Sequence, residues 1–121
     1  MRFESSQIKG KGRGKLLGYP TINLEIPENF ELEDGIYAVK VFSGSKEFIG
    51  ALHYGPIPVF KEDEKTLEVF LIDTSGEDIP DSKDFEIEIL KYLRPVLGFD
   101  SEQELSEQIG KDVEETRKIV S

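Results

Sequence analysis

The chain has 121 residues, of which 33% are charged, with no cysteine and a formal net charge of −10 at pH 7. An acidic surface disfavours broad binding to nucleic acids or anionic membranes, the lack of cysteine gives no sign of an oxidising compartment, and residues 1–6 contain no apolar run typical of a secretory signal or a membrane span. We therefore expect one cytoplasmic domain over residues 1–121 that acts as a monomer and binds neither nucleic acid nor membrane.

The amino-terminal region carries a local exception to this acidity. Three glycines alternate with basic residues, and each glycine lets the backbone approach a ligand closely. Backbone N–H groups and cations gathered in one loop are typical of a phosphate site. The candidate residues are Gly10, Lys11, Gly12, Arg13, Gly14 and Lys15. The alternative is a solvated turn, because glycine and lysine are both common in loops.

Pro20 follows this loop and predicts where a strand begins. Its ring fixes φ and biases Tyr19 toward an extended backbone, so Thr21 and Asn23 should start a strand with both side chains on one face. A hydroxyl and an amide oxygen then point the same way, which favours a metal site beside the phosphates. The alternative is structural, because asparagine often bonds neighbouring backbone and threonine is an ordinary strand residue.

Alternation of apolar and polar residues dominates the middle of the chain. Strands are predicted over residues 35–42, 48–54, 66–72 and 85–93, each bounded by turn-forming residues. Residues 43–46 have the length of a hairpin turn between the first two. Several short strands in about 90 residues predict a closed antiparallel β-barrel.

Glu68 is the candidate for chemistry within the third of these strands. Alternation places it on one face with Phe70 and Ile72, while Leu67, Val69 and Leu71 line the other face. A carboxylate is costly in so apolar a strand. The alternative is a charge on an edge strand that points to solvent and prevents aggregation.

The period changes to that of a helix from residue 101 onward. Leu105, Ile109 and Val113 recur at four-residue spacing, and Ser101 with Glu104 forms a capping box. Gly110 interrupts the pattern, and Asp112 with Glu115 offers a second cap. Two short helices and one bent helix are both compatible with this carboxy-terminal segment.

His53 is the single histidine of the chain. Its intrinsic pKa near neutrality suits a general base. No acidic or nucleophilic partner accompanies it in the sequence, so we interpret it as a structural residue.

Taken together, these segments resemble the riboflavin kinases, which phosphorylate riboflavin to FMN. The resemblance rests on residues 10–14, 17–24, 35–39, 55–60, 67–70, 93–95 and 99–101, which follow the family's order. It implies a Greek-key β-barrel with a C-terminal helical segment, riboflavin and ATP as substrates, and Mg²⁺ as the metal. Many bacterial relatives carry this module behind an adenylyl-transfer domain, for which these 121 residues leave no room, so we expect the kinase activity alone.

The resemblance also implies roles for individual residues. Glu68 matches the catalytic base, Thr21 and Asn23 match the ligands of Mg²⁺, and Pro20 and Thr21 join the loop 10–15 in binding the nucleotide. Arg94 and Phe99 fall near the flavin. Their alternatives are a surface ion pair for Arg94 and core packing for Phe99.

Three departures from the family's pattern concern loops near the substrates. His53 stands where the family usually has asparagine, Val59 replaces a usual threonine, and a common Leu-Tyr-Gly is missing around residues 79–82. These differences leave open a flavin- or nucleotide-binding module without turnover. An oligonucleotide-binding barrel is a further alternative, which the net charge of −10 disfavours.

Overall fold

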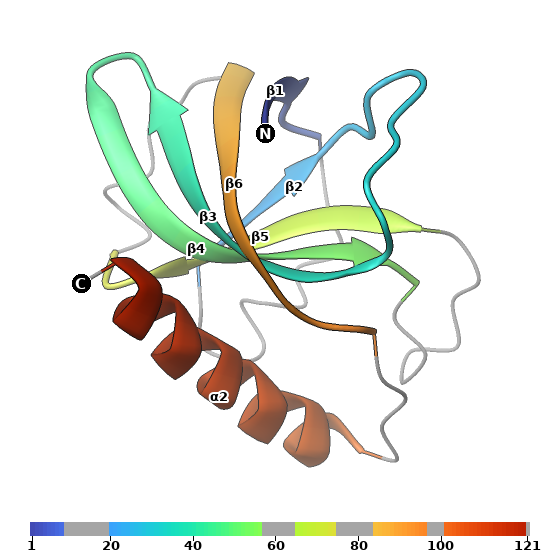
Figure 1. Ribbon diagram of the computed structural model, residues 1–121, viewed down its shortest axis with the longest axis vertical. Coiled ribbons are helices and arrows are strands. Elements are labelled where there is room, and N and C mark those ends of the chain that lie inside the picture. Colours follow the sequence, from blue (N-terminus) through green and yellow to red (C-terminus); the bar gives the residue numbers. More distant parts are fainter. Residues whose placement is uncertain (9–19, 57–64, 75–83, 97–100, 121) are drawn as a thin grey trace.

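Six antiparallel strands form one curled sheet, and a helix lies along its outer side (Figure 1). The computed structural model describes residues 1–8, 20–56, 65–74, 84–96 and 101–120. The elements are β1 (Arg2–Ser6), β2 (Thr21–Leu24), β3 (Gly35–Ser43), β4 (Lys46–Gly55), β5 (Thr66–Ile72), β6 (Asp84–Arg94) and α2 (Glu102–Val120). The strand order is β1-β6-β3-β4-β5-β2, and the curl gives the sheet the form of a half-barrel.

The two end strands of the sheet, β1 and β2, approach each other beyond their paired residues. Gln7 and Leu24 form an isolated antiparallel bridge. The Ile8 N–H donates to the Asn23 carbonyl at 2.8 Å, and the Glu25 N–H donates to the Ser6 carbonyl at 2.9 Å. The mainly β class with a C-terminal helix is therefore confirmed, whereas full closure of the barrel stays a prediction.

The predicted strands are confirmed with small differences in their ends, and β1 is an additional strand that the sequence pattern did not indicate. The hairpin between β3 and β4 is also confirmed, since Ser43 pairs with Lys46 across a two-residue loop. Gly44 occupies this loop at φ 60°, a left-handed conformation that glycine adopts without steric cost.

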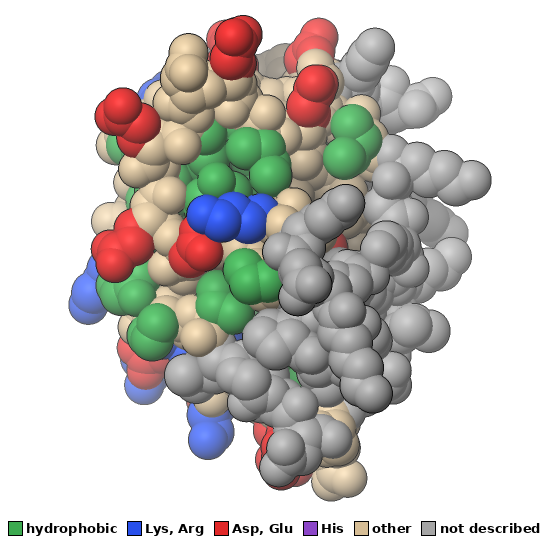
Figure 2. All heavy atoms as spheres, turned by 90° about the vertical axis from the view of Figure 1, so that its right-hand side faces the viewer, with side chains coloured by type: hydrophobic (Ala, Val, Ile, Leu, Met, Phe, Trp, Pro, Cys, Tyr) green, Lys and Arg blue, Asp and Glu red, His purple; other side chains and the backbone are tan. Residues whose placement is uncertain are grey.

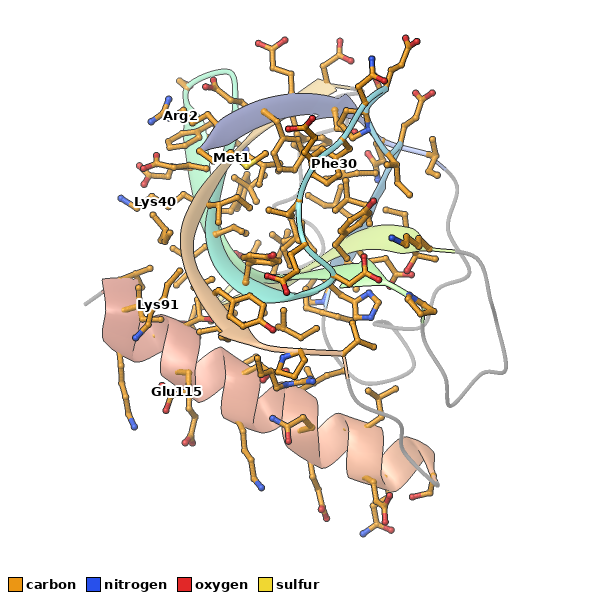
Figure 3. All side chains as sticks on the ribbon, turned by 45° about the vertical axis from the view of Figure 1, so that its right-hand side comes forward. Met1, Arg2, Phe30, Lys40, Lys91 and Glu115 are labelled. Atoms are coloured by element: carbon orange, nitrogen blue, oxygen red, sulfur yellow. The ribbon has the colours of Figure 1, made fainter. Side chains whose placement is uncertain are left out.

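Alternation along the strands buries one face of every central strand inside the curl. The interior is apolar, and its removal from water is the main favourable term for folding. Phe3, Phe30 and Tyr54 extend this core as a series of edge-to-face rings with centroids 4.9 and 5.0 Å apart. Figure 3 shows Phe30 on the inner side of the curled sheet. The buried members of the core are Ile22, Leu24, Tyr37, Val39, Val41, Phe48, Leu52, Tyr54, Leu67, Val69, Leu71, Phe85 and Ile87.

The carboxy-terminal segment is a single helix of 19 residues, so the alternative of two short helices is wrong. The first cap is present, because the Glu104 backbone N–H donates a hydrogen bond to Ser101 Oγ at 3.2 Å. Gly110 lies inside the helix, and a Cβ placed there would meet nothing within 4 Å. Asp112 does not cap a second helix but is buried in the middle of this one.

Two kinds of contact hold α2 against the sheet. Leu105, Ile109 and Val113 pack on Phe70 and Ile72 of β5 and form a second apolar cluster on the outer face of the sheet. The Arg94 guanidinium at the end of β6 donates to both carboxylate oxygens of Asp112, from Nε at 2.8 Å and from Nη2 at 2.7 Å. Figure 3 shows Glu115 on the side of α2 that faces away from the sheet.

The Arg94–Asp112 pair gives a first prediction on stability. Its side chains are only 14% and 6% exposed, so Asp112→Ala leaves a largely buried guanidinium without its counter-charge. Removing one partner of a buried pair typically costs about 3 kcal/mol or more of the free energy of unfolding. Urea denaturation measures this loss.

The matched control is Asp73→Ala, because Asp73 also binds a helix arginine through both oxygens. Arg117 donates to it at 2.6 and 3.2 Å, but these side chains are 50% and 60% exposed. We expect a loss below about 1 kcal/mol there, as for other exposed pairs. Equal losses in the two variants would contradict the role given to burial.

A second prediction concerns the close approach of β5 to β4 at Gly50. A Cβ at this position would stand 2.6 Å from Val69 Cγ1 and 2.9 Å from the Phe70 carbonyl oxygen. Gly50→Ala should therefore lower the free energy of unfolding by about 1–3 kcal/mol, as overpacking does. Gly110→Ala is the control with the opposite sign, because an open helical position favours alanine by about 1 kcal/mol. If Gly50→Ala left the free energy of unfolding in urea unchanged, β4 and β5 could move apart at this position without cost, and the prediction would be wrong.

Candidate active site

Strand register brings three polar residues into one row across the sheet. Asn23 of β2 lies directly opposite Glu68 of β5, and Glu68 lies directly opposite His53 of β4. Directly opposite residues share one face of the sheet, with Cβ atoms about 4.5–5.5 Å apart. Thr21 lies on the same face, two residues before Asn23 and opposite Phe70. The row is therefore a polar site assembled from three neighbouring strands.

This row lies on the outer face of the sheet, next to the residues that α2 covers. Phe70 and Ile72 belong to the cluster under α2, whereas Leu67, Val69 and Leu71 belong to the inner core. Glu68 shares the face of Phe70 because side chains alternate along β5. The predicted division of the two faces of this strand is thus confirmed.

Glu68 is buried, with 3% of its surface exposed. Its strand, β5, lies between β4 and β2 and is not an edge strand. The alternative interpretation of Glu68 as a solvent-facing edge charge is therefore wrong. Burial of a carboxylate is costly unless hydrogen-bonding groups surround it, so its surroundings must supply polar partners. Its role as a base stays a prediction.

His53 belongs to the same row, which the sequence reasoning missed. It is 8% exposed and has Glu68 as its cross-strand neighbour. No acidic partner accompanies His53 in the sequence, but the register brings Glu68 opposite it from another strand. The only signal available in the sequence was the alternation of β4 and β5, and the long connection between these strands hides their register.

Arg94 lies at the end of β6, opposite Ile36, which is itself opposite His53. Besides its two bonds to Asp112, it donates from Nη1 to the Pro95 carbonyl at 3.0 Å. Arg94 does form an ion pair, but the pair is buried between β6 and α2, so the alternative of a surface ion pair is wrong. Gln108 also donates to Asp112, at 3.2 Å. A contact of Arg94 with flavin stays a prediction.

Several predicted residues fall outside the described part of the chain. These are Gly10, Lys11, Gly12, Arg13, Gly14, Lys15 and Phe99. Pro20 is described, and its carbonyl accepts a hydrogen bond from the Leu71 N–H at 2.8 Å, which extends the pairing of β2 with β5. The predicted start of a strand at Thr21 is confirmed.

Thr21 and Asn23 supply the two oxygen donors that the sequence indicated for a metal. Both side chains are half-buried and lie on one face beside Glu68. Within the described ranges, no group of three or more His, Cys, Asp or Glu residues could hold a metal ion. A pair of neutral oxygens nevertheless fits Mg²⁺, a hard cation that keeps several of its waters.

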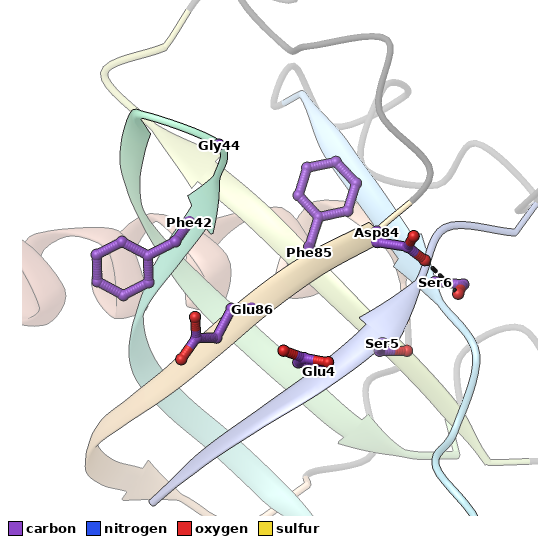
Figure 4. A pocket seen from close by; sticks show the side chains of 8 residues that line it. All are labelled: Glu4, Ser5, Ser6, Phe42, Gly44, Asp84, Phe85 and Glu86. Carbon is purple, nitrogen blue, oxygen red and sulfur yellow. Dashed lines mark hydrogen bonds between the residues drawn. The ribbon is translucent and has the colours of Figure 1, made fainter.

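A separate hollow lies on the β1–β6 side of the sheet (Figure 4). Its volume is about 380 Å³, and it is lined by Glu4, Ser5, Ser6, Phe42, Gly44, Asp84, Phe85 and Glu86. Ser6 Oγ donates to Asp84 there at 2.8 Å. Three carboxylates repel phosphate, so this pocket does not suit a nucleotide.

The surface of the described residues is mixed in charge. On the face shown in Figure 2, acidic side chains lie above and to the left of apolar side chains, and a basic side chain lies between two apolar groups. Lys65 bonds to Asp34 at 2.9 Å, and this hydrogen bond raises the pKa of the lysine. Within the part of the chain that the structure describes, no helix is both long enough and apolar enough for a membrane span.

The fold and the site together define an antiparallel β-domain with a C-terminal helix and a buried glutamate beside two oxygen donors. A family model described as "Flavokinase: Riboflavin kinase" matches residues 1–120. The chain therefore belongs to the riboflavin kinase family.

Individual relatives agree with this assignment. The chain is 35% identical to a bifunctional riboflavin kinase/FMN adenylyltransferase of Buchnera aphidicola (from Schizaphis graminum), over 92% of the chain and 36% of the relative. It is 34% identical to the riboflavin kinase of Mus musculus, over 92% of the chain and 75% of the relative. The chain thus spans about a third of the length of the bifunctional relatives.

A solved structure is similar over nearly the whole chain. It is a crystal structure described as a macrolide-efflux protein from Streptococcus pneumoniae, with a TM-score of 0.79 and 26% identity. The match covers 96% of this chain and 38% of that one. The likeness supports the architecture of a curled antiparallel sheet with a C-terminal helix.

Proposed function

We propose that this chain is an ATP:riboflavin 5′-phosphotransferase, which forms FMN and ADP from riboflavin and ATP. Membership of the riboflavin kinase family supports the choice of substrates. The observation that carries the proposal is the buried carboxylate of Glu68 directly opposite Asn23. A carboxylate shielded from water, beside oxygen donors, is suited to take a proton during phosphoryl transfer.

In the proposed reaction, Glu68 acts as the general base. The ribityl 5′-oxygen forms a bond to the γ-phosphorus while the bond to the β–γ bridging oxygen breaks, and the hydroxyl proton passes to the Glu68 carboxylate. Little covalent chemistry is required of the protein in such a transfer, so positioning and charge stabilisation dominate. A base fixed in a central strand meets the first of these requirements.

Thr21 and Asn23 would hold a divalent cation, for which we propose Mg²⁺. Their side-chain oxygens start from alternate positions of β2 and share the face of Glu68. When bound, such an ion neutralises charge on the phosphate oxygens. The two residues would thus hold the phosphates beside the base.

The remaining contacts to substrates are proposed from the resemblance. Pro20, Thr21 and the loop 10–15 would bind the phosphates of ATP, and Phe99 and Arg94 would lie on the flavin side. Because Arg94 bonds to Asp112, we propose that it contributes to flavin binding indirectly, by fixing α2 beside the flavin.

We further propose that the sheet closes into a Greek-key barrel. The bridge between Gln7 and Leu24, with its two flanking backbone hydrogen bonds, supports a continuous ring through β1 and β2. Closure removes the exposed edges of both end strands, which otherwise invite pairing with other chains.

The decisive experiment on the base is Glu68→Gln, which keeps the size of the side chain but accepts no proton. We expect both substrates to bind and kcat to fall on the order of a hundredfold, within the usual effect of general-base removal. The formation of FMN from riboflavin, ATP and Mg²⁺ is followed by chromatography. The control is Glu47→Gln, because Glu47 is an exposed strand glutamate paired with Lys40. A Glu68→Gln variant with parental kcat would falsify the assignment of the base.

A further prediction tests the cation site through Thr21→Ala and Asn23→Ala. Each variant removes one oxygen without opening a large cavity, so the fold should remain. We expect the Mg²⁺ concentration needed for half-maximal FMN formation to rise about tenfold or more, since even outer-shell changes cost 10–100-fold. Ser6→Ala, which removes a hydroxyl that donates to Asp84 in the acidic pocket, is the control. Parental turnover of both variants at limiting Mg²⁺ would remove these residues from the site.

A further inference from the structure

We propose that His53 is a positioning residue, which orients the Glu68 carboxylate by donating a ring N–H to it. The inference rests on the proposed function, because it takes Glu68 as the base. It goes beyond that function by adding a residue from a third strand to the site.

The first support is the register of β4 and β5. His53 and Glu68 are direct cross-strand partners, so both side chains leave the same face of the sheet. With Cβ atoms about 4.5–5.5 Å apart, an imidazole N–H and a glutamate oxygen reach hydrogen-bonding distance without any backbone movement.

The second support is burial. His53 is 8% exposed and Glu68 is 3% exposed, so neither side chain can rely on bulk water for its hydrogen bonds. Buried polar groups are nearly always hydrogen-bonded in native structures. A histidine and a carboxylate held opposite each other away from water are complementary, since imidazole donates and carboxylate accepts.

The third support is the apolar character of the surrounding positions. On this face, the described neighbours of His53 along β4 are Ala51 and Gly55, and its neighbour on β3 is Ile36. None of these side chains can donate or accept a hydrogen bond. Among the two residues directly opposite His53 and its two neighbours on this face of β4, Glu68 is therefore the one with an acceptor side chain.

The need for a positioning group follows from the length of the glutamate. Three side-chain torsions separate the Glu68 backbone from its carboxylate, and Phe70, the next residue on this face of β5, is apolar. Proton transfer requires the base within hydrogen-bonding reach of the hydroxyl. A misplacement of about 1 Å in such a site can cost as much as 10²-fold in rate, so a donor that fixes one carboxylate oxygen matters.

The opposing explanation is that His53 merely fills space between β3 and β5. Kinetics separate the two explanations, because a packing role affects the fold and substrate binding whatever residue 68 is. A positioning role acts only through a functional Glu68.

The experiment is a double-mutant cycle on FMN formation, with His53→Leu, Glu68→Gln and the double variant compared with the parent chain. We expect His53→Leu to lower kcat on the order of tenfold, with the KM values for riboflavin and ATP within about twofold of the parent. In the Glu68→Gln background, His53→Leu should have no further effect on kcat, because the base that it orients is absent.

Two further variants keep the test decisive if His53→Leu folds poorly. His53→Gln retains an N–H donor and should recover most of the parental kcat, while Ile36→Val, a packing change on the other side of His53, should leave kcat unchanged. Equal effects of His53 substitution with and without Glu68, or a parental kcat in every His53 variant, would overturn the inference alone. A parent chain that forms no FMN would overturn the proposed function and this inference with it.

Discussion

The register of the central strands is the constraint on which both fold and site depend. Because successive side chains alternate between faces, a slip of β5 by one residue would turn Glu68 into the core and Leu67 and Val69 out toward α2. The same slip would separate Glu68 from Asn23 and His53, its partners on both sides. Stability and site assembly therefore select the same pairing, and only that pairing places the Glu68 carboxylate between Asn23 and His53.

Two features of the structure hold this register, one at the core and one on the outer face of the sheet. Gly50 lets β5 approach so closely that Val69 and the Phe70 backbone occupy the space of a side chain. The helix α2 covers Phe70 and Ile72, and the Arg94–Asp112 pair fixes the helix to β6. On the outer face of β5, Glu68 thus lies next to apolar residues that α2 covers. The site formed by Asn23, Glu68 and His53 begins where this covered area ends.

Local patterns in the sequence were sufficient for every strand except β1, for the hairpin and for the first helix cap, since each of these is decided by neighbouring residues. The alternation around Glu68 even divided the two faces of β5 correctly. What the sequence could not supply is pairing between distant segments. The approach of His53 to Glu68 depends on the register across a long connection, and the burial of Asp112 depends on Arg94, eighteen positions earlier. Asp112 looked like a cap because its ion-pair partner lies on another element.

The distribution of charge bears on how an acidic chain can bind a polyanion. Several cations among the described residues are paired with a carboxylate. Arg2 pairs with Glu86 and Glu88, and Arg94 pairs with Asp112. Such cations are already neutralised and offer little attraction to ATP. The sequence places Lys9, Lys11, Arg13 and Lys15 next to glycines just before β2, whose residues face Glu68. We therefore propose that this short segment, which precedes the strand carrying Thr21 and Asn23, supplies the positive charge required by the proposed transfer.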